Sequence, residues 1–191
     1  MDFELSQEEK IILLKTARLS IAARLRHEAI QYPEPTSNLQ VHGGAFVSLH
    51  IAGKLRGCIG YIQAIKPLFD TIKEMALSAA FSDPRFVPLA ESELKKTEIE
   101  ISVISPLKKI DDIEEIKIGK HGIMIRRGLY SGLLLPQVAT QYGWDREQFL
   151  FHTCQKAGLP GNCWKLNDVE IEIFSAVVFS EKEFDLTYPA D

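Results

Sequence analysis

The residue types best suited to chemistry stand together at 55–60, Leu55-Arg56-Gly57-Cys58-Ile59-Gly60. The composition of this stretch predicts a β-strand. Because side chains alternate between the two faces of a strand, we expect Arg56 and Cys58 on one face and Leu55 and Ile59 on the other. A guanidinium beside a thiol favours the thiolate, the nucleophilic form of cysteine. The segment therefore carries a candidate reactive centre.

Two interpretations of this segment stay open at the sequence level. Gly57 and Gly60 carry no side chain, which lets a ligand or another backbone approach closely. Cys58 is then a candidate nucleophile, and His121 or Glu100 could supply its base if the fold brings either near. The alternative is that Cys58 packs as a small hydrophobe in a tight bend of the strand.

The nearby arginines have two possible roles. Arg56 and Arg85 could together hold a phosphate or carboxylate through forked donors. Equally, Arg85 could pair with Asp83, and Arg56 with Glu98 or Glu100. Paired carboxylates on one strand can do acid–base work, but alternating glutamates on a solvent face are the ordinary explanation. The stretch 83–86 predicts a helix end, with Asp83 and Arg85 as candidates for the rim of a binding site.

Histidine and the remaining cysteines give weaker signals. His121 stands at a strand entrance, either as an acid–base group or as a loop histidine bonded to a backbone carbonyl. His152, Cys154 and Cys163 have no usual zinc spacing, so no metal site is expected. The chain has three cysteines, an odd and widely spaced set, so no disulfide framework is expected either and Cys154 is interpreted as helix core.

Local patterns predict the elements that must position these residues. Ser6 and Glu9 form a capping box that starts a helix over 7–29. Hairpins are expected at 45–62 and 122–135, and a half-buried strand at 97–104. Further helices are expected from Pro67 to about 81, from 136 to about 143 and from 145 to 157, with a last strand at 169–179. The charged stretch 108–117 is expected at the surface. This order predicts an α+β fold with a mainly antiparallel or mixed sheet.

Composition excludes several protein classes. The 191 residues carry a formal net charge of −4, which argues against nucleic acid as a partner. No apolar run is long enough to span a membrane, and the first residues lack the features of a signal peptide. A cytoplasmic protein is therefore expected. No nucleotide-binding loop, serine-hydrolase elbow or zinc-protease motif occurs in the sequence.

Several ordered blocks resemble one known family. They are residues 55–60, 79–86 with Pro88, 99–106, 119–123, 134–138, and 156–159 with Trp164. Together they are similar to the AMMECR-one (AMMECR1) domain family and span nearly the whole chain. The resemblance implies a single α+β domain over 1–191, built of two subdomains with a cleft between them, in an intracellular protein. It does not indicate whether the domain catalyses a reaction, and its cofactor, if any, stays unknown. By association it implies a pathway shared with MEMO-like and radical-SAM proteins as partners.

Two functional hypotheses follow. The first is a ligand-binding or enzymatic domain for a small anion or a peptide segment, with its site at Arg56, Cys58, Asp83, Arg85 and His121. The second is a non-catalytic module that docks a partner through the face carrying residues 55–60. Whether the chain catalyses a reaction is left open by the sequence.

Overall fold

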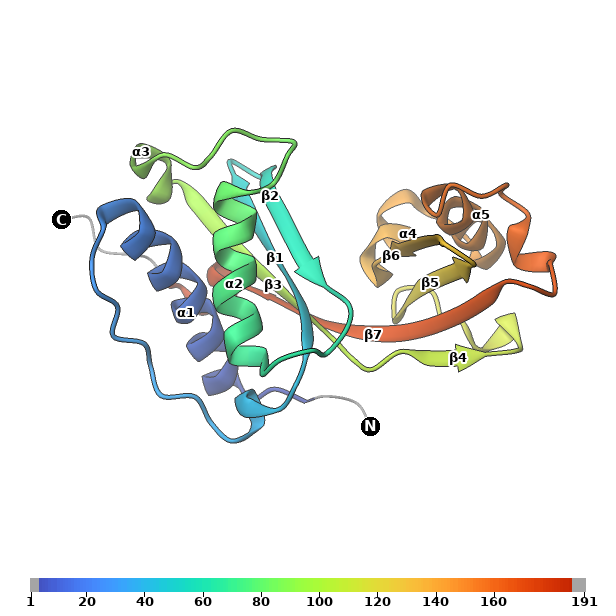
Figure 1. Cartoon of the computed structure of the whole chain (residues 1–191), viewed down its shortest axis with the longest axis horizontal. Helices are drawn as coiled ribbons and strands as arrows, with labels where there is room; N and C mark the ends of the chain where they lie inside the picture. Colours follow the sequence, from blue (N-terminus) through green and yellow to red (C-terminus); the bar gives the residue numbers. More distant parts are fainter. Residues whose placement is uncertain (1–3, 187–191) are drawn as a thin grey trace. The chain divides into compact units, whose positions relative to one another are not determined.

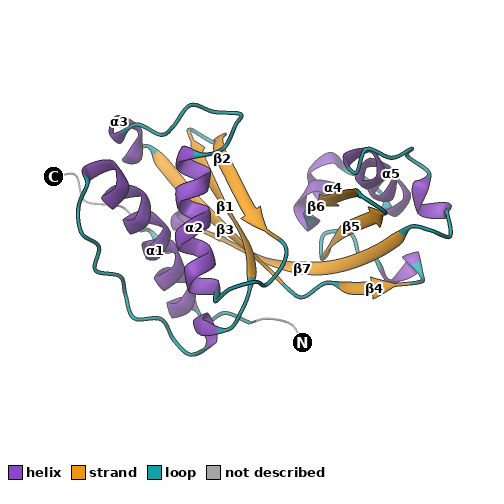
Figure 2. Cartoon of the chain, in the orientation of Figure 1, coloured by secondary structure: helices purple, strands orange, loops and turns teal. Residues whose placement is uncertain are grey.

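The computed structural model describes residues 4–186, which divide into two compact units. The larger unit comprises residues 4–104 and 177–186, and the inserted unit comprises residues 105–176. Among the described residues, seven strands pair in the order β2-β1-β3-β7-β5-β6, with β4 also paired to β7. The paired strands run mainly antiparallel and helices pack with them, which confirms the predicted α+β fold class (Figure 2).

The larger unit places two helices over one face of its strands (Figure 1). Its elements are α1 (Gln7–Arg26), the 3₁₀ turn η1 (Asn38–Gln40), β1 (Gly44–Ile51), β2 (Lys54–Tyr61), α2 (Leu68–Phe81), α3 (Glu91–Leu94), β3 (Thr97–Ile104) and η4 (Glu181–Phe184). β1 pairs antiparallel with both β2 and β3. Alternate strand residues such as Val47, Leu49 and Ile101 are fully buried in one core with α1 and α2. β2, which holds Cys58, is an edge strand.

The inserted unit has a core of its own. Its elements are β4 (Lys108–Ile110), η2 (Ile113–Glu115), β5 (His121–Arg127), β6 (Tyr130–Leu134), α4 (Pro136–Tyr142), α5 (Arg146–Lys156), η3 (Cys163–Lys165) and the first part of β7 (Glu170–Ser180). Its core gathers Ile123, Ile125, Phe149 and Leu150 among other buried residues. β7 continues beyond residue 176 into the larger unit, so one strand belongs to both.

Most predicted elements are confirmed, and two details differ. The capping box of Ser6 and Glu9 starts α1 as predicted, but α1 ends at Arg26 because His27 takes a left-handed conformation. The stretch expected only at the surface contains the short strand β4. In residues 4–186, no helix is long and apolar enough to cross a membrane.

The prediction that the cysteines form no disulfide is wrong for two of them. Cys154, on α5, and Cys163, in η3, are bonded, with their Cα atoms 6.0 Å apart. Both are completely buried. The chain turns back after α5 through Gly158, whose φ of 75° is the left-handed conformation that glycine adopts readily. This reversal brings together two residues only nine positions apart.

Candidate functional site

Cys58 lies at one end of a polar row that crosses three strands. Ser48 of β1 stands opposite Cys58 of β2 on one side and opposite Glu100 of β3 on the other. Directly opposed residues of antiparallel strands project to the same face, so these three side chains share one face. Leu49 and Ile101, next to them in sequence, point into the core with α1 and α2. We call Ser48, Cys58 and Glu100 the thiol row.

The thiol of Cys58 is partly exposed and has one hydrogen-bond donor. The hydroxyl of Ser48 donates to the Cys58 Sγ at 3.2 Å. A donor of this kind stabilises negative charge on sulfur. At the far end of the row, burial raises the pKa of Glu100, an effect that the charge of His50 partly offsets. Within residues 4–186, no hydrogen bond joins Cys58 to Glu100 or to His121.

Asp83 and Arg85 bind both backbone polar groups of Cys58 at the open edge of β2. The Cys58 N–H donates to Asp83 Oδ2 at 2.9 Å, and the Cys58 carbonyl accepts from Arg85 Nη2 at 3.2 Å. The two side chains also pair with each other, Nε to Oδ1 at 2.9 Å and Nη2 to Oδ2 at 2.7 Å. The Arg85 guanidinium holds the pKa of the Asp83 carboxyl well below its usual range. This pair supplies partners to backbone groups that an edge strand leaves unpaired.

The hypothesis of an Asp83–Arg85 ion pair is thus confirmed, whereas Arg56 has a partner that the sequence did not indicate. Arg56 donates to Glu93 of α3 through Nε at 2.8 Å and Nη2 at 2.9 Å, rather than to Glu98 or Glu100. The Arg56 side chain is only 13% exposed, while that of Arg85 is 54% exposed. An anion would therefore meet Arg85 more readily than Arg56.

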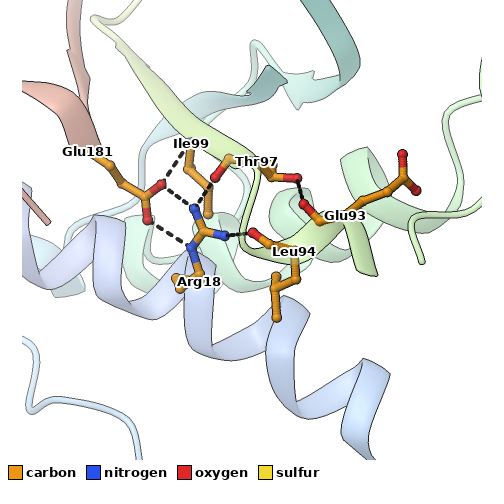
Figure 3. A network of polar contacts seen from close by, with 6 residues as sticks. All are labelled: Arg18, Glu93, Leu94, Thr97, Ile99 and Glu181. Carbon is orange, nitrogen blue, oxygen red and sulfur yellow. Dashed lines mark hydrogen bonds and ion pairs between the residues drawn. The ribbon is translucent and has the colours of Figure 1, made fainter. Parts of the chain in front are cut away.

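A buried network around Arg18, which the sequence did not indicate, joins α1 to the start of β3 and to Glu181 (Figure 3). Arg18 of α1 donates through Nε to Glu181 Oε1 at 2.9 Å and through Nη1 to the Leu94 carbonyl at 2.7 Å. Its Nη2 donates to the Thr97 carbonyl at 2.5 Å, and the Ile99 N–H donates to Glu181 Oε2 at 2.8 Å. Burial raises the pKa of Glu181, although its bonds to Arg18 oppose that shift. The network fixes the start of β3 against α1.

The buried network continues to the edge strand. The Thr97 hydroxyl donates to the backbone carbonyl of Glu93 at 2.9 Å, and the Glu93 carboxylate accepts both bonds from Arg56. The one local signal for it is that Arg18 stands beside Ala17 in the apolar stripe of the predicted helix. A charged residue among buried neighbours needs a partner, but its partner 163 positions away leaves no mark in the local pattern.

Gly57 and Gly60 lie in close contact with other parts of the chain rather than beside open space. A Cβ on Gly57 would lie 2.1 Å from the carbonyl oxygen of Ala79 on α2, and one on Gly60 would lie 2.4 Å from the ring of Phe46. These glycines therefore let α2 and Phe46 pack closely. The expected alternation also fails at Leu55, because a β-bulge pairs Leu55 with His50.

His121 belongs to the inserted unit, whereas Cys58 belongs to the larger one. The backbone N–H of Lys117 donates to His121 Nδ1 at 3.2 Å. The loop interpretation expected a backbone carbonyl as its partner, and it agrees with a hydrogen bond between His121 and the backbone of Glu115, which acts to raise the pKa of His121. Burial lowers the pKa of His121, and neighbouring lysines add to this shift. In the described part of the chain, no group of three or more His, Cys, Asp or Glu side chains is arranged to hold a metal ion.

Many residues around the thiol row belong to the sequence blocks that resemble the AMMECR1 family. The family model for AMMECR1 matches residues 14–179, which include Cys58 with its Asp83–Arg85 clamp and the inserted unit. The chain belongs to the AMMECR1 family. Arg18, whose partner Glu181 lies just beyond the match, also falls within it.

Similar AMMECR1-family proteins come from archaea. Protein MK0488 of Methanopyrus kandleri is 45% identical over 96% of this chain and 93% of its own length. Protein TK0174 of Thermococcus kodakarensis is 38% identical over 94% of each chain. The crystal structure of the uncharacterized protein PH0010 from Pyrococcus horikoshii superposes with a TM-score of 0.86 at 37% identity. That comparison covers 93% of this chain and 94% of PH0010.

Proposed function

We propose that the thiol row binds a peptide segment or a small molecule bearing an anionic group, with the Cys58 thiol as the contacting or attacking group. The observation that carries the proposal is the clamp on Cys58: Asp83 and Arg85 fix its N–H and its carbonyl, while its thiol stays partly exposed. A functional side chain whose backbone is held in this way is positioned before the ligand arrives. The half-exposed guanidinium of Arg85 adds attraction for an anionic group.

Each residue of the row has a distinct role in this proposal. Ser48 donates to the sulfur and stabilises charge that develops there. Glu100 stands at the far end of the row, and its raised pKa suits a carboxyl group that exchanges a proton with a bound ligand. Arg56 and Gly57 act indirectly, by fixing β2 against α3 and α2, and Gly60 does so by allowing Phe46 of β1 to pack closely.

Alkylation of Cys58 tests the proposal. Cys154 and Cys163 are bonded to each other, so iodoacetamide labels Cys58 in the folded protein, and mass spectrometry follows the rate at neutral pH. We expect faster labelling than of free glutathione, and a severalfold loss of rate in Ser48→Ala because the donor is gone. Ser92→Ala, at an exposed position of the same unit, is the matched control. Labelling no faster than glutathione and unchanged in Ser48→Ala would contradict a role for the thiol.

A second candidate function rests on a different observation. Arg56 and Arg85 both already bind carboxylates of the same chain, so their charges serve to build the strand. This favours a non-catalytic module that docks a partner through the thiol row, with a MEMO-like or radical-SAM protein as the partner class that the family resemblance implies. An inert Cys58, together with Cys58→Ser that still captures such a partner in purified form, would favour this candidate over the first.

A cytoplasmic location is part of the proposal and can be tested through the disulfide. Disulfides are rare in the cytosol of most organisms, where reducing systems keep thiols free. Cells lysed into an alkylating agent would report the state of Cys154 and Cys163 before air oxidation. Alkylated Cys154 and Cys163 would fit a reducing cytoplasm, whereas a fully oxidised pair would point to an oxidising compartment or to a cell with a disulfide-rich cytosol.

A further inference from the structure

The inserted unit contains a pocket of about 410 Å³ between α5 and the turn η3. Its lining includes Gln148, Phe151, His152, Asn162, Trp164 and Lys165. We propose that this pocket binds an uncharged planar heteroaromatic ring, such as a nucleobase or a nicotinamide. The pocket lies in a different unit from the thiol row, so this inference is independent of the proposed function.

Three aromatic side chains, Phe151, His152 and Trp164, line the pocket. Phe151 is 43% exposed, and Trp164 is partly exposed. The ring of His152 stacks on Trp144 with centroids 3.9 Å apart, and Trp144 stacks on Tyr142 at 4.9 Å. Stacked rings at a surface offer flat faces on which a further ring can stack, and they do so for any planar ligand.

The polar groups of the pocket suit the edge of a neutral heteroaromatic ring. Gln148 and Asn162 each carry an amide, which can both donate and accept hydrogen bonds. The Gln148 oxygen already accepts from the Asp145 N–H at 3.0 Å, which leaves its NH₂ group to donate. One acid, Glu147, balances one base, Lys165, so the lining has no net charge. A polyanion needs a basic surface, so a free ring is favoured over a nucleic-acid strand.

The walls of the pocket are fixed before any ligand binds. The Cys154–Cys163 disulfide ties the last turn of α5 to η3, which carries Trp164. A Cβ on Gly161 would lie 2.1 Å from Cε2 of Phe151, so the Phe151 ring rests directly on the Gly161 backbone. Preformed walls reduce the ordering cost of binding. The disulfide and Gly161 thereby hold the walls of the pocket in place, in addition to any part they play in core packing.

Tryptophan fluorescence gives a direct test, because the chain has two tryptophans. The variant Trp144→Phe leaves Trp164 as the sole reporter and keeps a ring stacked on His152. Adenosine, uridine and nicotinamide are titrated separately, with ribose as the non-aromatic control. We expect saturable quenching of Trp164 by at least one of the three rings and none by ribose.

Two variants locate the site, with binding measured by equilibrium dialysis. Trp164→Leu removes one stacking face, and Gly161→Ala displaces Phe151; we expect each to weaken binding at least tenfold, while Cys58→Ser leaves it unchanged. Circular dichroism establishes that each variant is folded, and should Trp164→Leu not fold, Gly161→Ala alone decides. No saturable binding of any ring, or binding that survives in a folded Gly161→Ala variant, would overturn the proposal.

Discussion

The two units stabilise their folds by different means. In the larger unit, two ion pairs have a buried member that also binds backbone groups: Arg18 binds the carbonyls of Leu94 and Thr97, and Asp83 binds the N–H of Cys58. In the inserted unit, pairs such as Lys109–Glu170 lie at the surface, 60% and 56% exposed. That unit has a disulfide in its core instead.

This difference shows that the stability contributed by an ion pair depends on which other groups its two members bind. An exposed pair contributes about 0–1 kcal/mol, because water screens it. A buried pair that also satisfies backbone groups cannot lose one member without leaving several groups unpaired. We therefore expect substitution of a buried charged residue in the larger unit to lower the free energy of unfolding far more than substitution of an exposed charged residue in the inserted unit.

Removing Arg18 should have the largest effect. Arg18→Ala leaves the Glu181 carboxylate buried beside unpaired carbonyls, and we expect a loss of about 3–5 kcal/mol in the free energy of unfolding. Urea denaturation measures it. Lys109→Ala in the inserted unit, which removes only an exposed pair with Glu170, is the matched control and should cost far less, because water screens that pair. Equal losses in the two variants would break the comparison between the units.

Removing the disulfide should destabilise the inserted unit by about 3 kcal/mol, the entropic value for a loop of this size. The double variant Cys154→Ala/Cys163→Ala is compared with the wild type by hydrogen exchange. We expect amides of α5 and η3 to exchange faster, while those of β1 and β3 keep their protection. Uniformly faster exchange through both units would mean that the disulfide does not act on the inserted unit alone.

Gly57 in the larger unit and Gly132 in the inserted unit each lie close to another backbone segment, so the packing within the two units can be compared. A Cβ on Gly57 would lie 2.1 Å from the Ala79 carbonyl oxygen, and one on Gly132 would lie 2.3 Å from the Ala157 nitrogen. We expect Gly57→Ala and Gly132→Ala each to cost about 1–3 kcal/mol, because a backbone must move in both cases. Thermal unfolding measures the loss. A variant as stable as the wild type would show that its helix shifts without cost.

The smallest effect is expected at Asp83, where Arg85 is half exposed and water weakens the pair. Asp83→Asn should cost about 1–2 kcal/mol near neutral pH. Because the pKa of Asp83 is lowered in the folded state, its contribution is present above the unfolded pKa of about 4 and is lost as the pH falls below it. Stability of the wild type should thus fall more steeply than that of Asp83→Asn when the pH decreases from 5 to 2. Parallel curves in that window would contradict the ion pair.

Sequence patterns predict what is local in this molecule. The capping box at Ser6, the helix predicted from 145 and the strand Thr97–Ile104 are confirmed, as is the Asp83–Arg85 pair between residues two positions apart. Each depends on interactions within a few residues, and such interactions leave a recognisable spacing.

Long-range partners could not be predicted in the same way. Glu93 binds Arg56 across 37 positions, and the sequence offered Glu98 and Glu100 as equally suitable carboxylates. The Cys154–Cys163 bond needs the reversal at Gly158 to bring its ends together, which spacing alone does not reveal. The row of Ser48, Cys58 and Glu100 likewise requires the strand register, because no sequence pattern pairs β1 with both neighbours.

The buried Arg18–Glu181 pair also has a consequence for biosynthesis. Glu181 is added to the growing chain 163 residues after Arg18. During translation, α1 and the strands β1–β3 therefore emerge from the ribosome before Glu181, which binds Arg18 in the folded protein, has been added. The larger unit is the first to begin emerging and yet can complete its core only after the whole inserted unit has been made. A nascent chain stalled before residue 181 should remain sensitive to protease in α1, even though every strand of its sheet except the end of β7 has been synthesised.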